Sequence, residues 1–271
     1  MVTRPARPAP HSLMPLVSDP ARLKRAARQL MRHSGSPGAD GITWAQYRHS
    51  LDTRITALAA RLRDRTWTPG PARVLVIPSW GKTLPLAIPT AEDRIVHRAA
   101  RLAAEPVLEA TGAYPAWMYG WRPRAGRVEA LTAATAHLAA GRTWVADLDV
   151  AAATSGATAE QALSWVARWV SDGSFLRLIQ LITASLPAPL SPGSGLTPLL
   201  TNLRLCPADE QLTGLAVIRF TDNYTAFCSS RREAGDAAAR ITAALATAGL
   251  RPNQAKSRIW QPNPEDLYLA G

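Results

Sequence analysis

Cysteine, lysine and long apolar runs are all scarce in this sequence, and each shortage excludes a class of protein. The two cysteines, Cys206 and Cys228, have no C-x-x-C spacing and no histidine cluster nearby, which argues against a disulfide framework or a zinc site. No apolar run approaches the roughly 18 residues of a membrane-spanning helix, and the N-terminus lacks the apolar core of a signal peptide. We therefore expect a cytoplasmic chain with no membrane partner.

Lysine occurs only at Lys24, Lys82 and Lys256, so arginine supplies almost all of the 31 basic residues. The formal net charge of +11 favours an anionic partner, and nucleic acid is the commonest such partner. A length of 271 residues with 47 % apolar residues allows one large or two small domains around a substantial core. Residues 1–19, which begin M-V-T-R-P-A-R-P, are predicted to form a disordered basic tail.

The segment from Val217 to Ser229 is predicted to form an antiparallel hairpin with an acid at its tip. Apolar, aromatic and β-branched residues lie on both sides of Thr221-Asp222-Asn223. The carboxylate of Asp222 is then exposed at a rigid corner, where it can reach a metal ion. An Asp-Asn pair is also good turn chemistry with no further role, so the hairpin alone leaves both interpretations open.

A second strand, predicted over residues 144–150, places two acids on one face. Side chains alternate along a strand, so Asp147 and Asp149 share the face of Val145, about 7 Å apart. A divalent cation shared with Asp222 would relieve their repulsion, and carboxylates around divalent ions are the basis of two-metal phosphoryl transfer. The alternative is a solvated edge strand.

Several other elements follow from apolar periodicity and capping residues. A basic hairpin with Lys82 at its tip, formed by 73–78 and 83–89, suits a triphosphate, although a lysine there also serves solubility. Aromatic residues and arginines mix over 117–124, where they can stack bases or pack a core. Helices are expected from Asp19, over 45–65, from Thr90 with Asp93 as a capping box, from Thr158, over 175–186, from Thr197 as N-cap and from Glu233.

The order of these features resembles the reverse transcriptases of bacterial group II introns and their relatives, over about residues 20–271. Each similar segment is weak alone, but their shared order is specific. The segments are P-G-A-D-G-I-T at 37–43, G-K-T-L-P-L-A-I-P at 81–89, D-R-I-V at 93–96, E-P-V-L-E at 105–109, Y-G-W-R-P at 119–123, W-V-A-D-L-D-V at 144–150, T-P-L-L-T-N at 197–202, F-T-D-N at 220–223 and G-L-R-P-N-Q-A-K at 249–256.

The resemblance implies an α+β, right-hand polymerase fold with an antiparallel palm sheet packed on helices. Fingers would lie mainly in 20–115 and the palm mainly in 116–271, with the thumb absent. Asp149 and Asp222 would bind two Mg²⁺ ions, or Mn²⁺ in their place, with Asn223 as the third catalytic position. The resemblance also implies nucleotide-binding roles for Lys82, Thr154, Gly193 and Lys256, and nucleic-acid contacts for Arg73, Arg122, Arg124 and Asn202.

The sequence departs from the family pattern at positions that face the substrate. Asn223 replaces the second acid of the hairpin tip, Leu84 replaces an arginine beside the triphosphate, and Pro192 replaces a glutamine before Gly193. Thr154 stands near the gate where the family has an aromatic residue that excludes ribonucleotides. Because the sequence ends where the family continues into a thumb, we expect weak processivity, and a partner protein or RNA to supply the thumb function.

Three functions remain open from the sequence. The first is an RNA-directed DNA polymerase with weakened activity, which uses an RNA template, a primer and deoxynucleoside triphosphates in two-metal nucleotidyl transfer. The second is a catalytically inactive module that kept the fold and binds RNA, DNA or a partner. The third is an untemplated or ribonucleotide-using nucleotidyltransferase.

Overall fold

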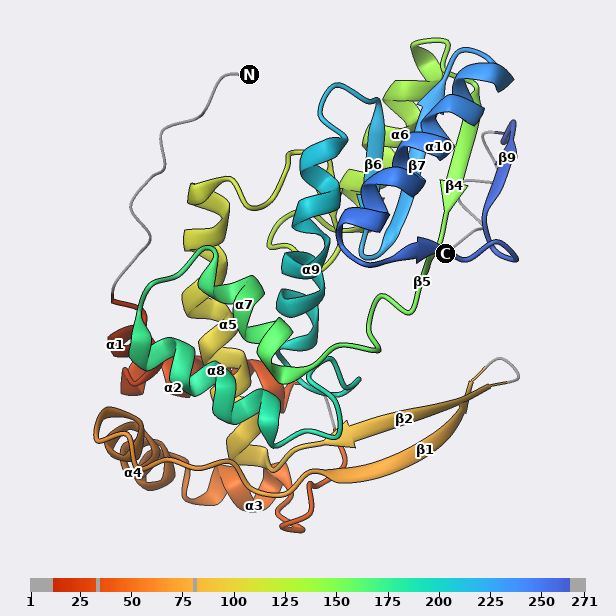
Figure 1. Cartoon of the computed structure of the whole chain (residues 1–271). Coiled ribbons are helices and arrows are strands. Elements are labelled where there is room, and N and C mark those ends of the chain that lie inside the picture. The colour runs from red at the N-terminus through yellow and green to blue at the C-terminus, as the bar shows by residue number, and fades with distance from the viewer. Residues whose placement is uncertain (1–11, 33–34, 80–81, 264–271) are drawn as a thin grey trace. The chain divides into compact units, whose positions relative to one another are not determined.

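Two units, each built from two separate stretches of sequence, make up the chain in this computed structural model. The structure describes residues 12–32, 35–79 and 82–263. The first unit comprises the residues up to Thr111 together with Thr154–Leu200, and the second comprises Gly112–Ala153 and the residues from Thr201 onward. Helices and sheets are both present, which confirms a mixed α and β composition (Figure 1). Residues 154–200, expected in the palm, group with the first unit by their contacts.

The first unit is mainly helical and is centred on α5 (Ala91–Thr111), which contacts α1 and α2. Ile95, Val96 and Ala100 of this helix are fully buried, and they form part of an apolar stripe at helical spacing. The other helices of this unit are α1 (Met14–Val17), α2 (Pro20–Met31), α3 (Trp44–His49), α4 (Leu51–Arg63), α7 (Ala159–Ala167) and α8 (Gly173–Ala184). Within the described ranges, no helix is long and apolar enough to cross a membrane.

Two expectations for the first unit are wrong in part. The helix predicted over 45–65 is two helices, α3 and α4, because Ser50 leaves the helical conformation with φ −121° and ψ 32°. The disordered tail predicted for residues 1–19 is wrong from residue 13 onward, because α1 buries Leu13 and Val17. Residues 1–11 of that predicted tail lie outside the described residues.

The predicted basic hairpin is confirmed as β1 (Arg73–Ser79) paired antiparallel with β2 (Lys82–Ile88). The register runs from Arg73 opposite Ile88 to Ser79 opposite Lys82. Lys82 therefore opens the second strand, next to the connecting residues 80 and 81, which lie outside the described part of the chain.

The second unit holds a five-stranded sheet of order β3-β6-β7-β4-β9. The β3–β6 pair is parallel and the other pairs are antiparallel. The strands are β3 (Met118–Tyr119), β4 (Trp144–Leu148), β6 (Val217–Phe220), β7 (Asn223–Cys228) and β9 (Arg258–Trp260), with a separate pair of β5 (Val150–Ala151) and β8 (Arg251–Pro252). The helices are α6 (Arg127–Ala139), the part of α9 (Thr197–Gln211) from Thr201, and α10 (Arg231–Thr247).

Both faces of this sheet carry apolar side chains, as the alternation along β4 predicts. Ala146 and Leu148 face a core that includes Ile241 of α10, which crosses the sheet in Figure 1. Val145 lies on the opposite face, in a smaller cluster with Ala134 of α6. Burying one such aliphatic side chain of valine or leucine size contributes about 1.5–3 kcal/mol, so the two clusters hold β4 firmly between its neighbours.

Candidate functional site

The strand register of the second unit brings Asp149 to the turn of the β6–β7 hairpin. Leu148, the last residue of β4, lies opposite Tyr224 of β7, and Phe220 pairs with Asn223. The hairpin therefore turns at Thr221 and Asp222, which confirms an acid at its tip, but Asp222 is partly buried there and not exposed as predicted. Asp149 follows Leu148 directly, and its charge acts on the carboxyl group of Asp222. Two acids from distant parts of the sequence thus share one edge of the sheet.

The turn adopts a strained backbone that neighbouring groups hold in place. Thr221 has a φ of 56°, in the left-handed region that disfavours β-branched residues. Its backbone N–H donates to the carbonyl oxygen of Tyr119 at 2.9 Å. A Cβ on Gly120 would lie 2.7 Å from the side chain of Thr221, so only glycine allows this close approach.

A buried arginine, Arg219, fixes the turn from beneath, and the sequence analysis missed it. Its Nε and Nη2 donate to the two carboxylate oxygens of Asp209 at 3.0 and 2.7 Å. Its Nη1 donates to the carbonyl oxygen of Thr221 at 2.6 Å and to Oδ1 of Asn202 at 3.0 Å. The hydroxyl of Tyr224 donates to the same carboxylate of Asp209 at 2.7 Å. We call these four residues and Thr221 the turn clamp.

The alternation of side chains along β6 could have predicted that Arg219 is buried. Arg219 lies two residues after Val217, which belongs to the main core, so an arginine on that face has to find a buried partner. Burial acts to lower the pKa of Arg219, but the carboxylate of Asp209 raises it and prevails, so the guanidinium stays charged.

Burial at the sheet edge disfavours the charged forms of Asp222 and Asp147. Burial raises the pKa of Asp222, the charge of Asp149 raises it further, and a hydrogen bond of 3.0 Å from the hydroxyl of Thr221 opposes them. Burial likewise raises the pKa of Asp147, which accepts a hydrogen bond of 3.1 Å from Thr225. A cation at this edge would favour the ionised forms.

Lys256 supplies one such cation. Its Nζ lies 3.5 Å from Oδ2 of Asp149, and the two side chains are 61 % and 25 % exposed, so the ammonium can exchange with another cation. The carbonyl oxygen of Asp149 accepts a hydrogen bond of 2.7 Å from the backbone N–H of Asn253, which fixes the backbone there. The predicted proximity of Lys256 to the acids is thus present in the structure.

The donor set at this edge is small for a metal site. In the described part of the chain, no group of three or more His, Cys, Asp or Glu side chains could hold a metal ion. Asp149 and Asp222 provide two carboxylates, and Mg²⁺ commonly binds one or two carboxylates while it keeps waters or phosphate oxygens as its other ligands. The residues therefore fit a metal that a phosphate-bearing ligand helps to bind.

Asn223 is the exposed first residue of β7. It lines a pocket of about 370 Å³ on the α6 face of the sheet, together with Asp147, Phe220 and Trp260. Its amide oxygen is neutral, so this position adds no negative charge beside Asp222.

The residues predicted to contact nucleic acid in the second unit differ in exposure. Asn202 is fully buried within the turn clamp, so its side chain is not available to nucleic acid and its role here is structural. Arg122 is partly buried and donates to the carbonyl oxygen of Pro115 at 2.8 Å. Arg124 is exposed, with a φ of 58°. Of these three side chains, that of Arg124 is the most accessible.

Four predicted site residues lie in the first unit. Gly193 has a φ of +98°, and a Cβ there would lie 2.1 Å from the carbonyl oxygen of Ala87. The N–H of Ala87 donates to the carbonyl oxygen of Pro192 at 2.8 Å, so this loop docks on β2, the strand that Lys82 opens. The other two are Thr154 and Arg73, which are both partly buried.

Comparisons with known proteins find a curated relative and distantly similar solved structures. No protein-family model matches the chain. Protein YkfC of Escherichia coli (strain K12) is 30 % identical over 217 residues, which cover 74 % of this chain and 56 % of that protein. The chain thus spans about half the length of the curated relative it matches.

Two similar solved structures are chains of complexes titled "Partial Cas6-RT-Cas1--Cas2 complex" and "Cas6-RT-Cas1--Cas2 complex". Each is 19 % identical, covers 88 % of this chain and has a TM-score of 0.43. The matched regions are 42 % and 26 % of those chains.

Proposed function

We propose that this chain is a reverse transcriptase-like protein whose second unit is a nucleotidyl-transfer palm. The observation that carries the proposal is the meeting of Asp149 and Asp222 at one edge of an antiparallel sheet. They belong to W-V-A-D-L-D-V and F-T-D-N, two of the segments that resemble group II intron reverse transcriptases in the same order. The expected substrates are an RNA template, a primer and deoxynucleoside triphosphates.

Each residue of the proposed site has a separate role in this reaction. Asp149 and Asp222 hold the divalent cations, and the turn clamp keeps Asp222 in place at the sheet edge. Bound Mg²⁺ or Mn²⁺ would activate the primer 3′-hydroxyl and stabilise charge on the leaving oxygen. Lys256 neutralises Asp149 when that cation is absent and is free to approach a triphosphate when it is present. The neutral Asn223 lowers the negative charge of the site, so weaker metal binding and slower turnover follow.

Primer extension tests the proposal directly. The purified chain is given a primed RNA template, Mg²⁺ or Mn²⁺, and either deoxynucleotides or ribonucleotides. We expect slow extension that Asp149→Asn reduces by at least about a hundredfold, because an essential metal ligand is lost. The matched control is Asp236→Asn, which removes an exposed acid from α10 and should leave extension unchanged.

Equal extension by wild type and Asp149→Asn would contradict the proposed site. Extension without a template, or with ribonucleotides alone, would redirect the assignment to an untemplated or ribonucleotide-using nucleotidyltransferase.

Restoring the second tip acid is a separate prediction. Asn223→Asp adds one ligand charge beside Asp222, and we expect it to lower the half-saturating Mg²⁺ concentration by about tenfold. A titration of primer extension with Mg²⁺ measures this, with Asn263→Asp as a control for an added charge far along the sequence. A half-saturating concentration that stays the same or rises would show that the missing charge does not limit metal binding.

A binding module that kept the fold is the second candidate. Two observations favour it: the described residues contain no group of three metal-ligating side chains, and Lys256 already lies beside Asp149. Salt-sensitive RNA binding without extension in either metal would support this candidate over an active polymerase.

A further inference from the structure

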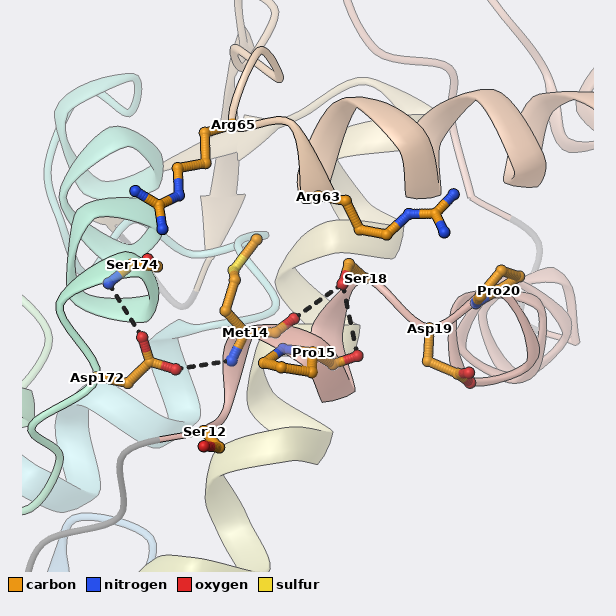
Figure 2. Close-up of a pocket in the computed structure, with 10 residues that line it drawn as sticks. All are labelled: Ser12, Met14, Pro15, Ser18, Asp19, Pro20, Arg63, Arg65, Asp172 and Ser174. Carbon is orange, nitrogen blue, oxygen red and sulfur yellow. Dashed lines mark hydrogen bonds between the residues drawn. The ribbon is translucent and has the colours of Figure 1, made fainter.

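A hollow of about 560 Å³ lies in the first unit, and none of the predicted site residues lines it (Figure 2). It forms where α1, the start of α2, the end of α4 and the start of α8 come together. Its lining includes Arg63, Arg65, Ser12, Ser18 and Ser174. Its size falls within the range of small-molecule sites.

The two acids of this hollow, Asp172 and Asp19, both accept hydrogen bonds from backbone N–H groups at the starts of helices. Asp172 accepts hydrogen bonds from the backbone N–H groups of Leu13 and Met14, both at 2.8 Å, and from two N–H groups at the start of α8, both at 3.0 Å. Burial alone would raise the pKa of Asp172, but these donors outweigh it and lower the pKa. Asp19 caps α2 by accepting from the N–H of Arg22 at 2.8 Å. The positive helix ends therefore offset both carboxylates.

The positive charges of Arg63 and Arg65, in contrast, are not neutralised by a carboxylate in the part of the chain that the structure describes. Among the described residues, neither Arg63 nor Arg65 forms an ion pair with a carboxylate, whereas Arg61 of the same helix pairs with Glu92 at 2.6 Å. Arg63 uses only its Nε, which donates to the carbonyl oxygen of Ala59 at 3.3 Å. Both side chains are exposed, so an anion can reach them.

Arg65 also occupies a backbone position that disfavours it. Its φ is 60°, in the left-handed region where glycine or asparagine commonly ends a helix, and a larger residue there costs about 1 kcal/mol. This conformation directs the guanidinium of Arg65 toward the start of α8, while Arg63 extends toward the start of α2 (Figure 2). The two guanidiniums thus lie at opposite sides of the hollow.

We propose that this hollow binds two phosphate groups of one ligand, with one group at Arg63 and the other at Arg65. Guanidinium groups bind phosphate through paired, charge-assisted hydrogen bonds. The hydroxyl groups of Ser12 and Ser174 offer neutral donors, whereas that of Ser18 donates to the carbonyl oxygen of Met14 at 3.1 Å. The phosphates come either from the backbone of an RNA strand or from a free polyphosphate such as that of a nucleotide.

The test measures binding of two probes to the whole chain in the presence of EDTA, which removes any contribution of divalent cations at Asp149 and Asp222. One probe is inorganic tripolyphosphate, measured by calorimetry, and the other is a labelled oligouridylate, measured by fluorescence anisotropy. The test variant is Arg63→Gln with Arg65→Gly. The control variant is Arg48→Gln with Arg177→Gln, which removes two exposed arginines of the same unit outside the hollow.

We expect the test variant to weaken binding of at least one probe by about tenfold or more, and the control variant to change it far less. Loss of tripolyphosphate binding identifies a free polyphosphate site. Loss limited to the oligouridylate identifies strand backbone, and the slope of log affinity against log salt should then fall by about 1.4, for two lost phosphate contacts.

Arg65→Gly alone relieves the left-handed strain and should raise the unfolding temperature, so weaker binding by the test variant is not a folding defect. Equal binding of both probes by wild type and test variant, or no binding by wild type, overturns the proposal. Because EDTA removes the divalent cations that Asp149 and Asp222 would hold, failure of this test and failure of primer extension are distinguishable.

Discussion

Asp93, in the first turn of α5, is a buried acid whose environment favours its protonated form. Its Oδ2 accepts a hydrogen bond of 3.0 Å from the N–H of Gly70. The Oγ1 of Thr90 accepts from the N–H of Asp93 at 3.1 Å, which is one half of the expected capping box. The reciprocal half is absent, because the carboxylate of Asp93 binds Gly70 instead. Burial raises the pKa of Asp93 from 3.8 to about 6. Its contribution to stability is therefore fully present below pH 3.8 and is lost as the pH rises through about 6.

Asp93→Asn should remove this dependence. The amide oxygen of asparagine still accepts from Gly70, but no charge has to be buried, so we expect the variant to be more stable at pH 7 by on the order of 3 kcal/mol. Urea unfolding of both proteins between pH 4 and pH 7 measures the difference, which should shrink toward the acid end. A constant difference across this range would contradict the assigned burial.

Gly193 lies where the structure leaves no room for a Cβ. Gly193→Ala combines a left-handed backbone with a Cβ 2.1 Å from the carbonyl oxygen of Ala87, so we expect destabilisation of about 3 kcal/mol or more. The matched control is Gly156→Ala, where φ is +69° but no atom lies within 4 Å, and only about 1 kcal/mol should be lost. Equal losses in the two variants, measured by chemical unfolding, would show that the loop does not press on β2.

At the scale of an element, the β6–β7 hairpin depends on the turn clamp. Arg219→Met removes the charge that pairs with Asp209 and frees the carbonyl oxygen of Thr221, and we expect a loss of about 3–5 kcal/mol. Arg219→Met combined with Asp209→Leu leaves no unpaired buried charge and should recover most of that stability. Primer extension should stay low in both, because the turn that bears Asp222 is no longer held.

Full recovery of extension in the double variant would limit Arg219 to a stabilising role. A loss of less than about 1 kcal/mol in the single variant would contradict its burial with Asp209.

Elements with a strict period could be predicted from the sequence. The alternation of side chains along β4 predicted which residues lie on each face of the strand. The hairpin was predicted with Asp222 in its turn. Both predictions depend only on residues that are neighbours in the sequence. The break at Ser50 was missed, because the apolar stripe of α4 continues the helical spacing of the residues before it. The turn clamp was missed for another reason: Asn202 and Asp209 lie on α9, and only tertiary packing brings them to Arg219.

At the scale of the whole molecule, the sequence predicted a mixed α and β chain. It did not predict which residues make up each of the two units. The sequence suggested two successive parts that meet near residue 115. In the structure each unit takes two stretches, and residues 154–200 join the first. The order of motifs along the sequence does not show which distant segments contact one another in the folded chain.

The cap that Asp172 provides for Leu13 and Met14 joins residues up to 159 positions apart, and this separation sets an order of events on the ribosome. At a synthesis rate of about 5–20 residues per second, roughly 10–30 s pass between translation of α1 and translation of Asp172, its hydrogen-bond acceptor. β4 emerges during that interval. The backbone N–H groups of Leu13 and Met14 must therefore stay solvated until after β4 has been synthesised.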